Sequence, residues 1–238
     1  MKRIKTLTAG IILLGQAFSG VALAASVTLT GTTVDFTFDD AMLGLFGPAN
    51  VSGNSLYFTP TDFEAQSLNG AGFALTNDTM NIKVSAHSGW LFSSIGLVEK
   101  GDYLLLGSGG TVDVAGQMRV FDVAAPLVDL TDSIVSSSPL TQVGLRTHNW
   151  TAEASTDLSA WNSAQAINVT IQNLLLASTS ATASLAFVEK KFVGLSVVTA
   201  PVPEAETYAM MLAGLGLVGF AAYRRQSKIG RLSARSQR

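Results

Sequence analysis

Hydrophobic and polar residues alternate with a period of two along the chain between residues 26 and 199. The alternation is clearest over residues 34–39, 81–86 and 167–172. Successive side chains of a β-strand point to opposite faces of a sheet, so this pattern is typical of half-buried strands. Short runs rich in Gly, Asn, Ser and Pro separate the segments, and such runs favour turns. We predict one all-β domain over residues 25–200, an antiparallel β-sandwich or a jelly roll of about ten strands.

Two finer predictions concern single strands. Residues 91–98 and 103–106 flank a charged run at residues 99–102, which predicts a hairpin with its turn in that run. Residues 111–123 are predicted to form one long strand, or two strands joined at Gly116. The sequence shows no repeat of fixed period, which argues against a solenoid or a propeller.

Charged residues divide the chain into three regions. From residue 25 to residue 203 there are 6 basic and 15 acidic residues, whereas the other 9 of the 15 basic residues lie at the two ends. Because Lys and Arg are retained on the cytoplasmic side of a membrane, we expect both ends to face the cytosol and the acidic domain to lie across the membrane. The acidic domain also lacks the clustered Lys and Arg that bind phosphates, so we predict no nucleic-acid partner.

The first 24 residues have the three regions of a secretory signal peptide. A basic start at residues 2–5 precedes an apolar stretch at residues 7–21, and Ala22 and Ala24 then form an A-x-A cleavage site. A buried N-terminal helix is the alternative, but such a helix would show one polar face. We predict export by the Sec machinery and cleavage before Ala25.

A stretch of 16 residues without charge, residues 208–223, lies near the C-terminus. It is shorter than the roughly 20 residues that span a bilayer comfortably, although tyrosines and arginines at its ends extend its reach. We predict a transmembrane helix over this stretch. Residues 226–238 are then a basic cytoplasmic tail.

The segment around this apolar stretch carries a recognisable motif. Its elements are, in chain order, Val202, Pro203, Glu204, Gly214, Gly216, Gly219, Arg224 and Arg225. In this order and spacing, residues 201–225 resemble the PEP-CTERM sorting signal, also called the ice-binding protein C-terminal domain. Ala205 departs from the motif, because a second proline usually stands there.

The resemblance implies that an exosortase-type enzyme in the membrane recognises the tail and cleaves near Pro203 and Glu204. The precursor would reside in the inner membrane, and the mature protein would reach the cell surface or the extracellular space. Proteins with similar tails are made by Gram-negative bacteria that secrete exopolysaccharide. Such a tail determines where the protein is sent and does not identify the domain to which it is attached.

The glycines of the tail also match a dinucleotide-binding pattern, G-x-G-x-x-G, at Gly214, Gly216 and Gly219. That pattern requires a preceding strand and a later acidic residue, and the chain has no acidic residue after Glu206. The glycines instead favour close packing in a membrane helix. We predict no cofactor.

The sequence offers few residues for catalysis or metal binding. It has two histidines, His87 and His148, and no cysteine, so disulfides and thiolate sites are excluded and a hydrolytic triad is not indicated. Acidic residues at 35, 39–40 and 62–64 lack the spacing of a calcium loop, and they would serve a glycosidase only if two of them faced each other across a cleft. We predict no catalytic residue and no metal site.

Five aromatic residues are candidates for a platform on which sugar rings stack: Trp90, Trp150, Trp161, Tyr57 and Tyr103. Tryptophan and tyrosine more often fill a core, so we expect most of them to be buried. A cleft lined by exposed members of this set would instead indicate carbohydrate binding.

The leading hypothesis is a non-enzymatic exported protein of the cell surface or extracellular matrix, sorted through its tail. Its expected partners are the Sec machinery, the membrane and the exosortase-type enzyme. A carbohydrate-binding module for the producer's exopolysaccharide is the first alternative. A secreted glycoside hydrolase is the second.

Overall fold

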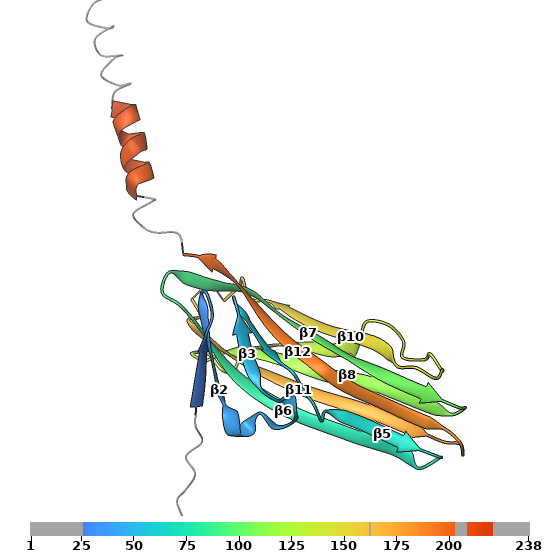
Figure 1. Cartoon of the computed structure of the whole chain (residues 1–238). Helices are drawn as coiled ribbons and strands as arrows, with labels where there is room; N and C mark the ends of the chain where they lie inside the picture. The colour runs from blue at the N-terminus through green and yellow to red at the C-terminus, as the bar shows by residue number, and fades with distance from the viewer. Residues whose placement is uncertain (1–25, 162, 203–208, 221–238) are drawn as a thin grey trace, which may run out of the picture.

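The structure is a computed structural model that describes residues 26–161, 163–202 and 209–220 (Figure 1). Within these residues the chain folds into twelve strands and two short 3-10 turns. They are β1 (Ser26–Thr30), β2 (Val34–Asp39), η1 (Asp40–Met42), η2 (Gly44–Phe46), β3 (Ala49–Ser52), β4 (Ser55–Phe58), β5 (Glu64–Leu68), β6 (Gly72–Ala86), β7 (Trp90–Leu106), β8 (Gly110–Asp122), β9 (Asp129–Ser136), β10 (His148–Asp157), β11 (Ala166–Thr179) and β12 (Leu185–Pro201). The predicted all-β domain is confirmed.

The strands form one antiparallel sheet that folds over itself into a sandwich. Their order is β1-β2-β6-β11-β8-β9-β10-β7-β12-β4-β3, and β5 pairs with β12 beside β4. Only two residue pairs join β9 to β10, so the sheet bends there into a second layer. The first layer, from β1 to β9, packs on the second through contacts of β8 and β11 with β12. Figure 1 shows the long strands running side by side to one end of the molecule.

The three segments with the clearest alternation meet in the core. Phe36 of β2 pairs with Val84 of β6, which pairs in turn with Ile167 of β11. All three side chains are fully buried. Burying an aliphatic or aromatic side chain contributes about 1.5–3 kcal/mol, so each such row stabilises the first layer considerably.

The predicted hairpin turn at residues 99–102 is wrong. These residues lie in the middle of β7, which runs unbroken from Trp90 to Leu106 and pairs with β10 on one side and β12 on the other. The acidic side chains of this run, Glu99 and Asp102, pair with lysines of β12. The segment predicted at 111–123 forms a single strand, β8 (Gly110–Asp122), with Gly116 inside it. Position 116 needs glycine, because a Cβ there would meet the backbone oxygen of Gln172 at 2.3 Å.

The two ends of the chain are only partly described. The predicted signal peptide, including Ala22, Ala24 and Ala25, lies outside the described residues, as does the predicted tail at 226–238. Residues 209–220 form a helix with exposed side chains. In the part of the chain that the structure describes, no helix is long and apolar enough to cross a membrane. The predicted transmembrane helix at 208–223 lies only partly within the described residues.

Candidate functional site

The sorting motif begins where the sandwich ends. Pro201, the last residue of β12, pairs with Trp90, and the backbone N–H of Val202 donates to the oxygen of Gly89 at 2.8 Å. The domain and the motif therefore adjoin without a spacer.

The other motif residues fall into two groups. Gly214, Gly216 and Gly219 lie in the helix of residues 209–220, and a Cβ at any of them would have no described neighbour within 4 Å. Pro203, Glu204, Arg224 and Arg225 lie outside the described residues. Their roles remain predictions.

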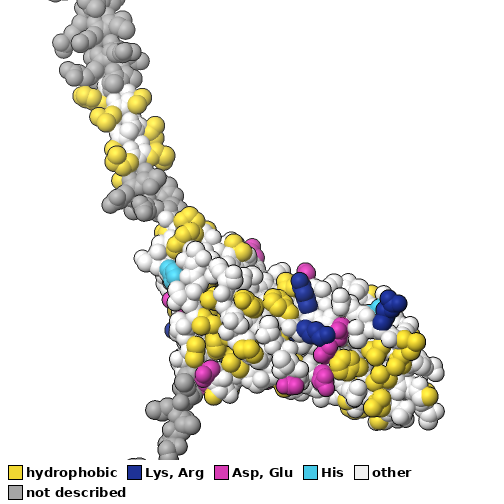
Figure 2. Space-filling view, viewed as in Figure 1, with side chains coloured by type: hydrophobic (Ala, Val, Ile, Leu, Met, Phe, Trp, Pro, Cys, Tyr) yellow, Lys and Arg dark blue, Asp and Glu magenta, His cyan; other side chains and the backbone are white. Residues whose placement is uncertain are grey.

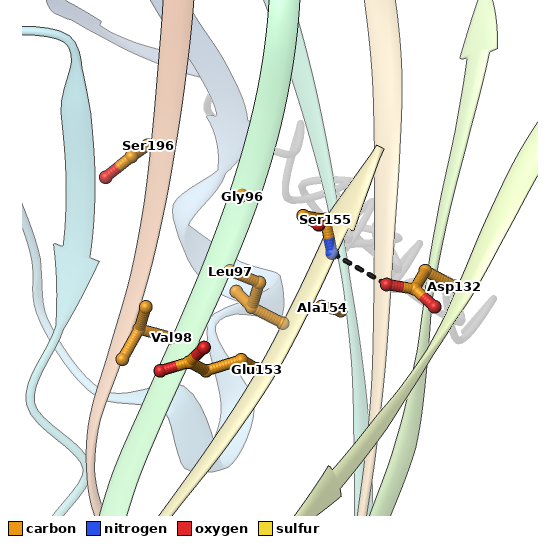
Figure 3. Close-up of a pocket in the computed structure, with 8 residues that line it drawn as sticks. All are labelled: Gly96, Leu97, Val98, Asp132, Glu153, Ala154, Ser155 and Ser196. Atoms are coloured by element: carbon orange, nitrogen blue, oxygen red, sulfur yellow. Dashed lines mark hydrogen bonds between the residues drawn. The ribbon is translucent and has the colours of Figure 1, made fainter. Parts of the chain in front are cut away.

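A row of small residues crosses the outer face of the second layer. Ser196 of β12 pairs with Ser55 of β4 and with Gly96 of β7, and Gly96 pairs with Ser155 of β10. The row leaves a depression of about 260 Å³ (Figure 3). Its lining residues are Gly96, Leu97, Val98, Asp132, Glu153, Ala154, Ser155 and Ser196.

An aromatic pair continues this face toward the middle of β12. The rings of Tyr57 and Phe192 are stacked, with centroids 6.2 Å apart, and the ammonium of Lys100 lies 5.9 Å from the Phe192 ring. Gly194 allows the arrangement, since a Cβ there would lie 2.7 Å from a carbon of that ring. Gly194 pairs with Val98, which lines the depression. We call the depression together with Tyr57, Phe192 and Lys100 the outer strip.

Two carboxylates line the depression, Asp132 and Glu153. Asp132 accepts a hydrogen bond of 2.7 Å from the backbone N–H of Ser155. Figure 3 shows the Glu153 carboxylate turned toward Val98, away from Asp132. The two groups thus do not face each other as the acid and base of a glycosidase do.

A bulge in β12 places a charged cluster next to the outer strip. The register with β7 shifts between Lys190 and Phe192, so Lys191 is an extra residue. Its ammonium lies 2.6 Å from both Asp102 and Glu189, which are opposite each other on β7 and β12. The hydrogen bond to Asp102, and then the one to Glu189, raises the pKa of Lys191, and burial raises the pKa of the Glu189 carboxyl. Figure 2 shows acidic and basic side chains gathered over the middle of the long strands.

A second charged pair lies inside the sandwich. The Lys190 ammonium donates to Glu99 Oε2, and both side chains are fully buried. The ammonium also lies 5.1 Å from the ring of Phe63 and 5.9 Å from that of Trp150, where cation–π attraction operates. Burial lowers the pKa of Lys190, and the attraction of Glu99 opposes that shift.

Sequence reasoning did not single out this pair. The only local signal is a charged run in the middle of an alternating segment, and such a run is typical of a turn. The partner, Lys190, lies 91 residues from Glu99 along the chain.

Two of the five aromatic candidates are buried, fewer than expected. Trp150 and Tyr103 are each 2% exposed, Trp161 packs partly against the core, and Trp90 is half-buried. The expectation of a core role is thus confirmed for Trp150 and Tyr103. Tyr57 is half-buried and lies on the outer strip.

Some of the acidic and histidine candidates have hydrogen-bond partners in the structure. The ring of His87 lies 3.0 Å from Asp35, and that hydrogen bond lowers the pKa of the Asp35 carboxyl. Asp39 accepts a hydrogen bond of 3.0 Å from the backbone of Ala41 and caps η1. Among the described residues, no three His, Asp or Glu side chains are grouped as ligands for a metal ion.

Comparison with known families bears on the C-terminal segment. Residues 201–226 match the PEP-CTERM protein-sorting motif. The chain carries a PEP-CTERM sorting signal. The resemblance predicted from the sequence is thereby confirmed. The motif implies an exported protein that an exosortase-type enzyme sorts. A search of the curated proteins finds no match to the sequence.

Solved structures give distant neighbours of the sandwich. A structure of infectious bursal disease virus, Gt strain, aligns at 11% identity and a TM-score of 0.25, over 78% of this chain and 60% of the viral one. TmCBM61, solved in complex with β-1,4-galactotriose, aligns at 10% identity and a TM-score of 0.19, over 71% of this chain and 86% of its own. At TM-scores this low, neither neighbour indicates what this chain binds.

Proposed function

We propose that this chain is a non-enzymatic protein of the cell surface or extracellular matrix of a Gram-negative bacterium that produces exopolysaccharide. The Sec machinery exports the precursor, the tail holds it at the inner membrane, and an exosortase-type enzyme processes it. The sorting motif at residues 201–226 is the observation that carries this proposal. The signal peptide expected at residues 1–24 is consistent with it.

The fold supports processing at this place. β12 ends at Pro201, and Val202 donates a backbone hydrogen bond to Gly89 of the domain. Cleavage near Pro203 and Glu204 would remove no paired residue of β12. The sandwich would therefore leave the membrane with its sheet intact.

Replacing Pro203 and Glu204 together with alanine tests the proposal. Neither residue lies in the apolar stretch, so membrane retention of the precursor should persist while processing fails. We expect uncleaved protein in the inner-membrane fraction and a matching loss from the surface and medium. Glu206→Ala is the matched control, because it removes a carboxylate from the same segment and should be processed normally. Identical distribution of the double variant and the wild type, with and without the host's exosortase, would contradict the proposal.

A second candidate function is binding of exopolysaccharide along the outer strip. Its stacked Tyr57 and Phe192 rings supply an apolar surface for a sugar ring, and the adjacent depression offers polar groups from Ser155, Ser196 and Glu153. Carbohydrate sites of this kind need both an apolar face and hydrogen-bonding groups. The outer strip provides them side by side.

Affinity electrophoresis through gels that contain the producer's exopolysaccharide tests this function. Tyr57→Ala should abolish most of the retardation shown by the wild-type protein. Phe73→Ala is the control, because Phe73 is a 78% exposed aromatic on β6, in the other layer. Equal loss in both variants, or a wild-type protein that is not retarded, would contradict binding at the outer strip.

A further inference from the structure

Three buried polar side chains lie in the interior of the sandwich: Glu99, Lys190 and Asn173. Each is at most 1% exposed. Lys190 is hydrogen-bonded to Glu99, whereas Glu99 Oε1 and both amide atoms of Asn173 have no hydrogen-bond partner among the described residues. Unpaired polar atoms at this depth are uncommon, and a catalytic role is one of the explanations for them.

The topology brings Asn173 and Lys190 to the same level of the sandwich. Asn173 precedes the end of β11 by six residues, and Lys190 follows the start of β12 by five. The two strands are consecutive in the chain, belong to opposite layers and contact each other. Buried neighbours at alternate positions, Ile171 and Leu175 on β11 and Val188 on β12, show that both side chains point inward.

The surroundings favour a nucleophilic amine at Lys190. Burial lowers the pKa of its ammonium, and the rings of Phe63 and Trp150 exclude water around it. Desolvated lysines of this kind react with carbonyl carbons, because the neutral amine is the reactive form. Glu99, hydrogen-bonded to the same nitrogen, is in place to accept its proton.

We propose that Lys190 and Asn173 form an intramolecular isopeptide bond, with Glu99 as the acid–base group. Glu99 accepts a proton from the Lys190 ammonium, and the freed amine attacks Asn173 Cγ. The Nζ–Cγ bond forms and the Cγ–Nδ2 bond breaks. Of the two protons that Nζ loses, one leaves with Nδ2 as ammonia and the other stays on the Glu99 carboxyl. The step needs no oxidant or cofactor, but it requires the Lys190 amine to come within bonding reach of Asn173 Cγ.

Such a bond would tie β11 to β12, the strand that ends at the sorting motif. The chain has no cysteine, so disulfides cannot stabilise the exported domain. An amide between side chains would supply a covalent tie that also resists reduction. This inference is independent of the proposed function.

Mass spectrometry of the full-length wild-type protein tests the proposal. After denaturation, the intact mass should fall short of the sequence mass by one ammonia. Chymotrypsin cleaves at Leu174–Leu176 and Phe187, between the two residues, so the digest should contain a branched peptide that joins the Asn173 and Lys190 segments. An intact mass equal to the sequence mass would overturn the proposal. Loss of water with Lys190 joined to Glu99 would overturn the assignment of Asn173.

Variants at Lys190 and Asn173 provide a second test, provided that they fold. Lys190→Met should abolish the mass deficit, and Asn173→Asp should lose water in place of ammonia. Lys191→Met is the matched control, because the Lys191 side chain is 54% exposed and bound to Asp102 and Glu189, and it should keep the ammonia deficit. A deficit that persists in Lys190→Met would also overturn the proposal. The wild-type measurement decides the question even if a variant fails to fold.

Discussion

Gly101→Ala should destabilise the domain strongly, because β12 and an indole ring lie against this glycine. A Cβ at Gly101 would stand 1.9 Å from the backbone oxygen of Glu189 and 2.7 Å from a ring carbon of Trp150. The same oxygen accepts a hydrogen bond of 3.1 Å from the Trp150 indole N–H. The added methyl group must therefore displace either the strand or the ring.

The magnitude follows from what would be displaced. Removing a buried tryptophan from its packing costs about 3–5 kcal/mol, and parting the two strands would lose hydrogen bonds worth about 1 kcal/mol each. We expect Gly101→Ala to lower the free energy of unfolding by about 3–5 kcal/mol, or the melting temperature by roughly 6–20 °C for a domain of this size.

Gly96→Ala is the matched control for this measurement. It lies on the same strand, and the nearest atom to its added Cβ would be the oxygen of Ala154 at 3.9 Å. We expect a change within about 0.5 kcal/mol, since a contact at that distance is ordinary. Urea titrations followed by tryptophan fluorescence measure both variants. A loss below about 1 kcal/mol in Gly101→Ala would refute the close approach of β12 to Gly101 of β7.

Three further predictions concern separate parts of the chain. Trp150→Phe should lower the free energy of unfolding by about 1–3 kcal/mol in the same titration, because the Trp150 indole N–H donates to the buried backbone oxygen of Asp102 and to the part-buried one of Glu189. His87 lowers the pKa of Asp35, so the stability difference between wild type and Asp35→Asn should be present above about pH 4 and vanish as the pH falls through the lowered pKa, which urea titrations across pH would show. N-terminal sequencing of the exported protein should begin at Ala25, and retention of Met1 would contradict the predicted signal peptide.

The features that depend only on nearby residues of the chain could be predicted from the sequence. The alternation around Phe36, Val84 and Ile167 identified inward-facing residues, since a strand with one buried face must place apolar side chains at every second position. The sorting signal was predictable for the same reason, because its recognition depends on consecutive residues of the tail. Neither required knowledge of which strands are neighbours.

The features that could not be predicted depend on pairing between strands that are far apart in the chain. A charged run such as residues 99–102 is typical of a turn. Here it lies inside a strand, because β12 places Lys190 beside Glu99 and Lys191 beside Asp102. The outer strip depends on the register of five strands from distant parts of the chain: β4, β7, β9, β10 and β12. A shift of one residue in any of them would turn its side chains to the other face.

The bulge at Lys191 permits a last test of that register. Lys190 pairs with Gly101 and Phe192 with Lys100, which are adjacent on β7, so deletion of Lys191 should leave a continuous ladder. Deleting a residue from a regular strand reverses the faces of all residues beyond it, but here the ladder should remain unchanged.

We expect the deletion variant to fold and to lose about 1 kcal/mol, because the lysine that bridges Asp102 and Glu189 is half-exposed. Adding Glu189→Gln should recover part of that loss by removing the repulsion between the two carboxylates. Deletion of Val188, a buried residue in the regular part of β12, is the control and should prevent folding. Circular dichroism and urea titration distinguish these outcomes. An unfolded Lys191 deletion beside an equally unfolded Val188 deletion would show that Lys191 belongs to the ladder and that β12 pairs with β7 in a different register.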